Sequence, residues 1–376
     1  MKQNLLLISL DTLRADVAYS GKFKTIEKLR SCSATFINTI SSSPLTPCSH
    51  ASVFTGLQPY NHGVRHLFKE KLKKDTTTLA QILKENNYKT KAIISCPGMN
   101  KWYGFSKGFD NYDDEIPLLA DGSDPLKTID VKKRGTALKR ASVVTERAIN
   151  WLEKNKDEQF FLFIHYFDAH WPYEAPEIYG GDNAYENEVA YSDHYLGKVF
   201  DYLEKNKLMD STTIVCFSDH GEDLNGWYPN DKGGKKLGHP EENGHGCLLY
   251  NQTQKVVLII KNRIISKKSN FNNQVRLIDV LPTILDLLSI NSKLKNIDGI
   301  SLLPVLQKKI KDSYIGYSET FYPEEQAKTE PSLSYVKNKK AFFFDNEFKV
   351  INNLDSDLQE AYDLISDINE KYNLIK

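Results

Sequence analysis

The sequence alternates short apolar runs with amphipathic stretches as far as residue 288. Leu5–Leu10 is a continuous apolar run, which is typical of a parallel strand buried on both faces. Ser142–Lys154 and Glu188–Lys205 each place their apolar residues on one helical face. This alternation predicts an α/β fold with an open, mostly parallel sheet and helices on both faces. Further strands are expected at Lys91–Ser95, Phe160–His165, Thr212–Phe217 and Lys255–Ile260, and further helices at Ser49–Leu57, Thr77–Asn86 and Ile278–Leu288.

The alternation of apolar runs and amphipathic stretches gives way to another pattern after about residue 305. Short strand-like segments separated by polar turns predict a small antiparallel α+β layer packed against the main domain. We therefore expect a catalytic domain at residues 1–305 and a C-terminal antiparallel subdomain at residues 306–376. The polar stretch Asn225–Gly244 is expected to form a mobile loop near the site, because long loops without regular structure are often functional. The expected C-terminal strands are Tyr314–Ser318, Ser334–Val336, Lys340–Phe344 and Phe348–Ile351.

Polar clusters follow several of the expected strands at the point where each strand ends. Asp11 follows the first apolar run, the segment His165–His170 closes another, and Asp219 and His220 follow Thr212–Phe217. Ligands of open α/β sheets bind beyond the carboxyl ends of the strands. Because core packing does not require charged clusters at several strand ends, the sequence predicts a shared binding site there.

Asp11, Asp219 and His220 supply the oxygen and nitrogen donors expected of a divalent-metal site. A bare buried carboxylate is costly, so Asp11 requires either a metal or a partner such as Arg14. The mixed donor set suits Mn²⁺, Zn²⁺, Mg²⁺ or Ca²⁺ without separating them, and one or two ions are compatible with it. The alternative for Asp219 and His220 is a surface turn that ends in a helix cap.

Thr46 lies just before the helix expected at Ser49–Leu57. An oxygen there faces backbone N–H groups and the positive end of the helix dipole, a favourable place for an oxyanion. A bound divalent cation would lower the pKa of the Thr46 hydroxyl, making Thr46 both a metal ligand and a nucleophile. The alternative is that Thr46 only caps the helix.

A second group of donors lies farther along the chain. His165, Asp168 and His170 fall within six residues, and His245 stands between two glycines. Asp168, His170 and His245 are candidate ligands of a second metal, His165 is a candidate substrate clamp, and His170 or His245 is expected to protonate the leaving group. An isolated histidine is more often structural.

Three cations are candidates for binding an anionic substrate. They are Arg14, Arg65 and Lys101, and solvated surface charge is the alternative for each. The chain as a whole has 49 basic and 49 acidic residues, and hence a net charge of zero. This balance gives no signal for a nucleic-acid partner.

The five cysteines are odd in number and match no zinc spacing, so we expect free, reduced thiols in a cytoplasmic protein. No signal peptide precedes Leu5–Leu10, and that run is shorter than the ~20 apolar residues that cross a bilayer. The expected localisation is therefore cytoplasmic, without a membrane segment. A homo-oligomer remains open. The cysteines are Cys32, Cys48, Cys96, Cys216 and Cys247.

With these residues in view, the chain resembles the sulfatase-like branch of the alkaline phosphatase superfamily. The resemblance runs nearly end to end and implies an α/β/α sandwich with a metal-bound covalent nucleophile. The residues that carry it are Ile8–Asp16, Ser49–Leu57, Gly108–Asp110, His165–Tyr173, Ser218–Glu222, His245 and Gly246, Asp279–Thr283, Asp298–Leu303 and Ala361–Leu364.

The departures from the family pattern bear on the substrate. Sulfatases carry Cys-X-Pro-X-Arg, whose cysteine becomes formylglycine. Here those three positions are occupied by Thr46, Cys48 and His50, which makes His50 a candidate substrate-binding residue. Thr12 replaces the second aspartate of the sulfatase Asp-Asp pair, and His220 stands where many sulfatases have asparagine. This pattern resembles relatives with an unmodified threonine, which are mostly phosphoryl-transfer enzymes.

The sequence therefore predicts a metal-dependent hydrolase of a phosphoester or phosphodiester that acts through a covalent Thr46 intermediate. Its expected substrate is a small-molecule or glycan-linked anionic ester. One alternative is a sulfate-ester hydrolase, with formylglycine at Cys48 disfavoured because His50 and Ser52 replace the required Pro and Arg. The others are a phosphoryl or phosphonate transferase of glycan biosynthesis and a non-catalytic binding protein with the same fold.

Overall fold

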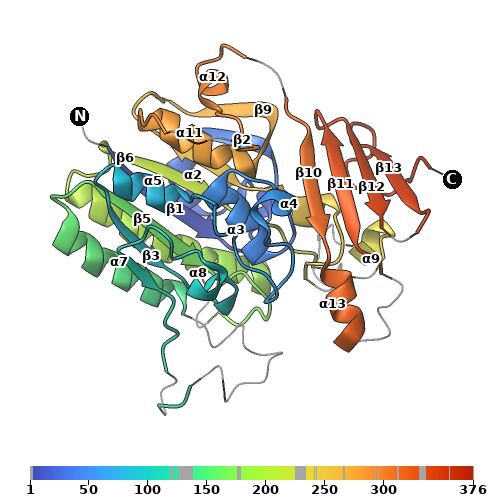
Figure 1. The fold of residues 1–376 in the computed structure, drawn as a ribbon, viewed down its shortest axis with the longest axis horizontal. Coiled ribbons are helices and arrows are strands. Elements are labelled where there is room, and N and C mark those ends of the chain that lie inside the picture. Colours follow the sequence, from blue (N-terminus) through green and yellow to red (C-terminus); the bar gives the residue numbers. More distant parts are fainter. Residues whose placement is uncertain are drawn as a thin grey trace.

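The chain forms a large central sheet covered by helices and a second, smaller sheet at its C-terminal end (Figure 1). The structure is a computed structural model. It describes residues 3–118, 122–124, 127, 139–175, 179–224, 234–240, 242, 244–265, 267–292, 294, 296–310, 313–329, 336–354 and 356–375.

The central sheet has the strand order β4-β3-β5-β1-β6-β8-β2-β7, with β9 paired to β2. The strands from β4 to β6 run parallel, whereas β8 is antiparallel to both β6 and β2, so the sheet is mostly parallel with a mixed edge. The strand bounds are β1 Asn4–Leu10, β2 Ala34–Ile40, β3 Lys89–Ile93, β4 Asn111–Asp113, β5 Phe160–Tyr166, β6 Thr212–Phe217, β7 Lys255–Val256, β8 Leu258–Lys261 and β9 Ser269–Arg276.

Both faces of the central sheet are packed against helices, as the continuous apolar run at its centre predicts. Successive side chains of a strand point to opposite faces. In β1, Leu5 and Leu7 join one apolar core, and Leu6 and Ile8 join the other. The first core includes residues of α3, Thr46–Thr55, α5, Leu79–Glu85, and α11, Val280–Leu287. The second includes residues of α2, Lys24–Arg30, α7, Ala141–Asn155, and α8, Ala184–Lys205. The expected α/β/α sandwich is confirmed.

The C-terminal residues form a four-stranded antiparallel sheet in the order β10-β11-β12-β13. Its buried face packs around Phe343, Ile351 and Tyr362 in a third apolar core, which also includes Ile40 of β2. The small antiparallel layer is thus confirmed, while the domain boundary at residue 305 stays a prediction. The bounds are β10 Gly316–Thr320, α13 Tyr322–Thr329, β11 Lys339–Phe344, β12 Phe348–Asn353 and β13 Gln359–Asp363.

Several expected elements differ in the structure. The single strand expected at Lys255–Ile260 is divided into β7 and β8, because β2 pairs with each of them through different residues. In the expected loop Asn225–Gly244, residues 225–233 lie outside the described residues, and Gly234–Leu237 form the short helix α9. The strand expected at Ser334–Val336 also lies outside them except for Val336. The remaining short helices are α1 Ala15–Ala18, α4 Pro59–His62, η1 Pro97–Met99, η2 Lys101–Tyr103, α10 Asn251–Gln254, η4 Leu277–Asp279 and α12 Leu303–Leu306.

Within the ranges given above, none of the helices has the length and apolar character needed to cross a membrane.

Candidate metal centre and active site

The carboxyl ends of three neighbouring strands bring the predicted site residues together. Ser9 of β1 pairs with His165 of β5 on one side and with Phe217 of β6 on the other. Asp11 follows β1 by one residue, and Asp219 follows β6 by two. Because the strands are parallel and in this register, the side chains at their ends converge on one point above the sheet edge.

Asp11, Thr46, Asp219 and His220 form one compact group of donors. The carboxylates of Asp11 and Asp219 and the imidazole of His220 offer ligand atoms within 4.8 Å of one another. Nε2 of His220 lies 3.3 Å from Oδ2 of Asp219, 3.3 Å from Oγ1 of Thr46 and 3.9 Å from Oδ1 of Asp11. The sequence placed these four residues together, and the structure brings them to one place.

The donors fit a divalent cation because two of their buried oxygens lack partners. Oδ1 of Asp11 and Oδ2 of Asp219 are buried without a hydrogen-bond partner. Burial raises the pKa of both carboxyls to about 7, and for Asp219 the charge of Asp11 adds to the rise. Burial also lowers the pKa of His220 to about 4, so the imidazole is neutral and offers a lone pair. A bound cation would offset the mutual repulsion of the two carboxylates.

A strained turn holds Asp11 at the end of β1. Thr12 adopts a φ of 58°, the left-handed region that a β-branched residue rarely occupies. Its backbone N–H donates to Oδ1 of Asp219 over 3.2 Å, and its carbonyl accepts from the Tyr185 hydroxyl over 2.9 Å. The same hydroxyl accepts the N–H of Arg14 over 2.9 Å. Strain of this kind persists only where surrounding contacts fix it, and such positions cluster at functional sites.

Thr46 is the first residue of α3, and its side chain faces the donor group. The capping position belongs to Leu45, and the Thr46 hydroxyl contacts His220. The structure therefore does not support the alternative that Thr46 only caps the helix. Thr46 keeps 7% of its surface exposed, whereas Asp219 and His220 are fully buried.

His50 lies beneath Thr46 instead of in contact with solvent. It is fully buried, its Nε2 lies 2.8 Å from Oγ of Ser9, and its Nδ1 lies 2.8 Å from the carbonyl oxygen of Thr46. Burial lowers the pKa of His50 to about 3, so the ring is neutral. The expectation that His50 contacts substrate is therefore not met, because helix α3 directs this side chain toward the sheet. It supports the backbone of Thr46.

His245 and His170 lie beside the donor group on its more open side. The ring of His245 has its centroid 4.1 Å from that of His220 and 4.9 Å from that of His170. Nδ1 of His245 lies 2.9 Å from Oε1 of the buried Glu222. Glu222 belongs to the motif at the end of β6, but no role was predicted for it. Its contact with His245 could not be found from sequence, because 22 residues separate the two.

The remaining predicted residues are held elsewhere. Arg14 pairs with Asp16 at 3.0 Å and donates to the Glu222 carbonyl. Arg65 pairs with Glu319 of β10 at 2.6 Å. Neither pairing brings the guanidinium to Thr46.

Lys101 and Asp168 also have other surroundings than expected. The ammonium of Lys101 is mostly exposed, 3.8 Å from Asp114. Asp168 lies 3.4 Å from Arg140 and accepts the N–H of Ala141 at the start of α7. Both contacts are made by Oδ1, whereas Oδ2 is buried without a hydrogen-bond partner, so the expected role of Asp168 as a second-metal ligand stays a prediction. His165, expected to clamp substrate, instead has its Nε2 3.0 Å from Oδ2 of Asp11.

Comparison with known proteins identifies the family. Residues 3–290 match the sulfatase family. The chain belongs to the sulfatase family. Proteins of this family typically use a divalent metal, which agrees with the donor group at Asp11, Asp219 and His220. The resemblance seen in the motifs is thereby confirmed, and the protein is a sulfatase-like hydrolase.

The similar curated proteins are arylsulfatases. Arylsulfatase K of Gallus gallus is 21% identical over 377 residues, covering 83% of this chain and 68% of the relative. Arylsulfatase D of Homo sapiens is 29% identical over 196 residues, covering 48% of this chain and 32% of the relative. The match thus spans about two thirds of one relative and about a third of the other. These similarities favour the sulfate-ester alternative over the expected phosphoester.

Solved structures share the fold at low sequence identity. The phosphonate monoester hydrolase of Agrobacterium radiobacter superposes with a TM-score of 0.74 at 16% identity, covering 99% of this chain and 91% of that one. A protein solved with its substrate D-glucosamine-2-N,6-O-disulfate superposes with a TM-score of 0.73 at 18% identity, covering 100% and 93%. At these identities the likeness establishes the fold alone.

Proposed function

We propose that this sulfatase-family hydrolase cleaves a sulfate ester, with the hydroxyl of Thr46 as the nucleophile. The observation that carries the proposal is the placement of the Thr46 hydroxyl at the start of α3, 3.3 Å from Nε2 of His220 in a buried set of metal-type donors. Similarity to arylsulfatases supports sulfate as the group transferred. The phosphoester expected from sequence becomes the second candidate.

Asp11, Asp219 and His220 would hold the divalent cation, with Thr46 as a further ligand. When bound there, the cation supplies Lewis acidity that lowers the pKa of a hydroxyl and stabilises charge on the transferred group. The first turn of α3 adds backbone N–H groups at the positive end of the helix dipole. Both effects stabilise negative charge on oxygens near Thr46, where it accumulates in the transition state.

The reaction proceeds in two steps that use the residues of this chain. In the first, Oγ1 of Thr46 releases its proton to solvent and bonds to sulfur while the bond between sulfur and the ester oxygen breaks. The leaving oxygen takes a proton from the side where His245 and His170 lie. In the second step, water bonds to sulfur, the bond to Thr46 breaks, and Thr46 regains its proton as sulfate leaves. Glu222, by engaging Nδ1 of His245, leaves Nε2 of that ring to exchange the proton.

A small or glycan-linked sulfate ester is the proposed class of substrate. One structural neighbour was solved with D-glucosamine-2-N,6-O-disulfate and another with k-i-k-neocarrahexaose. These ligands belong to those proteins. They support the proposal for this chain because the likeness covers its whole length.

A phosphoester is the second candidate because of one residue. Formylglycine is made from cysteine, and Thr46 stands at the position that the motif comparison assigns to that cysteine. An unmodified hydroxyl fits phosphoryl transfer, in which catalysis rests on positioning and electrostatic stabilisation. The transferase alternative stays a prediction.

One panel of initial rates tests the proposal. Aryl sulfate, aryl phosphate monoester, phosphate diester and phosphonate monoester would be assayed with Mn²⁺, Zn²⁺, Mg²⁺, Ca²⁺ or chelator. We expect sulfate turnover that chelator abolishes, that Thr46→Ala abolishes and that Thr46→Ser partly keeps. Cys48→Ala is the matched control, because Cys48 is buried two residues away in the same helix.

Each outcome of the panel separates the candidates. Higher turnover of a phosphoester than of sulfate would transfer the assignment to the second candidate. Sulfate turnover lost in Cys48→Ala and retained in Thr46→Ala would overturn the nucleophile. The cytoplasmic localisation remains a separate proposal, supported by the free cysteines and tested by fractionating the expressing cells.

A further inference from the structure

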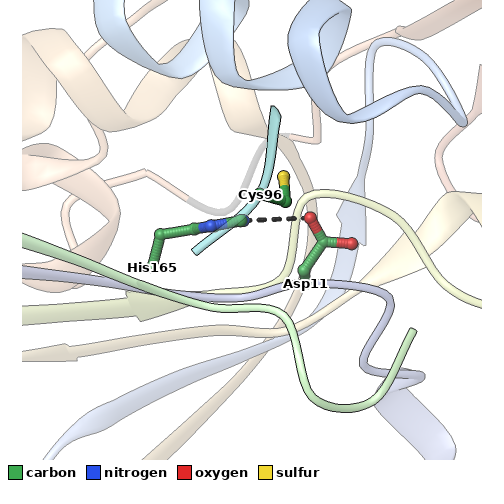
Figure 2. Close-up of side chains that lie close together, drawn as sticks. All are labelled: Asp11, Cys96 and His165. Atoms are coloured by element: carbon green, nitrogen blue, oxygen red, sulfur yellow. Dashed lines mark hydrogen bonds and ion pairs between the residues drawn. The ribbon is translucent and has the colours of Figure 1, made fainter. Parts of the chain in front are cut away.

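Cys96 lies beside Asp11 and His165. It follows β3 by three residues, is 3% exposed, and its sulfur lies within 4.8 Å of ligand atoms of both neighbours. Figure 2 shows the three side chains together, with the Asp11 carboxylate facing the edge of the His165 ring. Cys96 was expected to be one of five free thiols, because no spacing pattern linked it to a site.

The carboxylate of Asp11 faces two groups of donors, one with each oxygen. Its Oδ1 lies 3.9 Å from Nε2 of His220 and has no hydrogen-bond partner. Its Oδ2 lies 3.0 Å from Nε2 of His165. The carboxylate thus reaches two sets of donors, His220 with one oxygen and His165 with the other, and Cys96 belongs to the second set.

Ser95 holds the ring nitrogen of His165 that faces away from Asp11. The Ser95 hydroxyl donates its proton to the His165 carbonyl and lies 3.0 Å from Nδ1 of the ring. The backbone N–H of Ser95 also donates to Nδ1, over 3.4 Å. On the other side of the ring, Nε2 lies 3.0 Å from a carboxylate oxygen of Asp11, a contact that requires a proton or a cation between the two atoms. Metal-binding histidines characteristically have the other ring nitrogen held by such a partner.

The chemistry of this second donor set differs from that of the first. Thiolate, imidazole and carboxylate together select Zn²⁺ over Mg²⁺ or Ca²⁺, which prefer oxygen ligands alone. We propose that Cys96, His165 and Oδ2 of Asp11 form a second metal centre that takes Zn²⁺ and shares Asp11 with the first. This set is distinct from the second-metal ligands predicted from sequence, which were Asp168, His170 and His245.

The distances between the ligand atoms show how far they must move to bind zinc at the second centre. Tetrahedral zinc with bonds of 2.0–2.3 Å brings its ligand atoms to about 3.3–3.6 Å from one another. Nε2 of His165 and Oδ2 of Asp11 are 3.0 Å apart, so these two atoms would separate by about 0.3–0.6 Å, and the Cys96 sulfur, within 4.8 Å of both residues, would move toward them. A Cβ placed on Gly98 would lie 3.7 Å from Cβ of Thr46. The turn that carries Cys96 therefore borders the nucleophile.

Binding of Zn²⁺ at the second centre releases one proton. The Cys96 thiol gives its proton to solvent as the sulfur–zinc bond forms, because the thiolate is the ligand. With zinc on Nε2, the neutral His165 ring carries its proton on Nδ1, beside the Ser95 hydroxyl, and releases none. The proposal shares Asp11 with the proposed function, but it concerns a different set of ligands and does not depend on which ester is cleaved.

Cobalt substitution and metal counting test the second centre directly. Metal-free wild-type protein would be titrated with Co²⁺, and the near-ultraviolet thiolate-to-cobalt charge-transfer band would be recorded against added equivalents. We expect two equivalents bound per chain and one thiolate band. Cys96→Ser should bind one equivalent and lose the band. The controls are Cys48→Ser, a buried thiol in α3, and Cys32→Ser, an exposed one; both should keep the band and two equivalents.

The results separate this proposal from the proposed function. Absence of the band in wild-type protein, or its persistence in Cys96→Ser, would overturn the second centre even if Cys96→Ser misfolded, because the wild-type spectrum alone suffices. One equivalent without a thiolate band would leave the first centre and refute the second. One equivalent with a thiolate band would leave the second and refute the first. Zinc content measured after growth in zinc-supplemented medium should agree with the cobalt count.

Discussion

The contact between Glu222 and His245 makes a quantitative prediction about proton transfer. Oε1 of Glu222 lies 2.9 Å from Nδ1 of His245, and the carboxylate is fully buried. Glu222→Gln keeps an acceptor oxygen at that distance but removes the negative charge. A buried hydrogen bond to a charged group is worth about 1.5–3 kcal/mol and a neutral one about 0.5–1.5 kcal/mol. The variant therefore loses about 1–1.5 kcal/mol of support for a protonated His245.

That loss is expected to appear in the rate. Since each 1.4 kcal/mol is roughly a factor of ten, Glu222→Gln should lower kcat about tenfold on the substrate that the ester panel identifies. Glu222→Ala also removes the acceptor that orients the ring, and it should approach the loss in His245→Ala, which we expect to be about 10²-fold or more. KM should change little, because His245 exchanges its proton in the transition state.

A double-mutant cycle provides the decisive comparison. In a His245→Ala background, Glu222→Gln should have no further effect, because the side chain through which Glu222 acts is absent. Glu188→Gln is the matched control, since Glu188 is also buried with its pKa raised to about 7, but it pairs with Arg140. The reasoning fails if Glu222→Gln keeps full kcat, or if its effect is undiminished without His245.

Two further predictions concern stability. Tyr185→Phe removes the hydroxyl that donates to the buried Thr12 carbonyl, so the free energy of unfolding in urea should fall by about 1–3 kcal/mol; an unchanged unfolding midpoint would contradict this. Burial, with the charge of Lys73 adding to it, lowers the pKa of His62 to about 3 in the folded state, against about 6.5 when unfolded. A lowered folded pKa means that stability is lost as pH falls below 6.5, so His62→Gln should remove about 1.5–2 kcal/mol of the wild-type decline between pH 6.5 and 5. Equal declines in both proteins would show that His62 is not the group responsible.

The main layers of the fold were predictable because the hydrophobic pattern determines them. An apolar run such as Phe160–Tyr166 is stable only as a strand covered by helices on both faces, and the apolar face of the amphipathic helix α8 must pack against a sheet. β2 and β9 were not predicted. Ala34–Ile40 includes Thr and Asn, and Ser269–Arg276 is mostly polar with partly exposed residues, so neither has the apolar pattern of a central strand. Both lie toward one edge of the sheet, where pairing partners decide strand formation more than side chains do.

The donor group was predictable for the same geometric reason, whereas its supporting contacts were not. Asp11 and Asp219 each follow a buried parallel strand, so their meeting follows from the sheet alone. The direction of a side chain on α3 depends on how the helix docks, and this is why His50 was misplaced. The contacts of Glu222 and Cys96 join residues from separate loops, whose conformations carry no periodic signal.

The arrangement around Asp11 links the chemistry of the site to the stability of the fold. Two carboxylates with unpartnered oxygens and a threonine at a φ of 58° are all unfavourable in the folded state without a ligand. They persist because the strands beneath them belong to two apolar cores in which residues such as Leu7 and Ile8 are fully buried. A cation that binds the folded chain relieves the repulsion between Asp11 and Asp219, and its binding free energy adds to the free energy of unfolding. Because Asp11 faces both donor sets, an ion bound at one centre also keeps the Asp11 carboxylate ionised for the other centre. Binding of the first ion should therefore raise the affinity for the second, and repulsion between the two ions limits this gain.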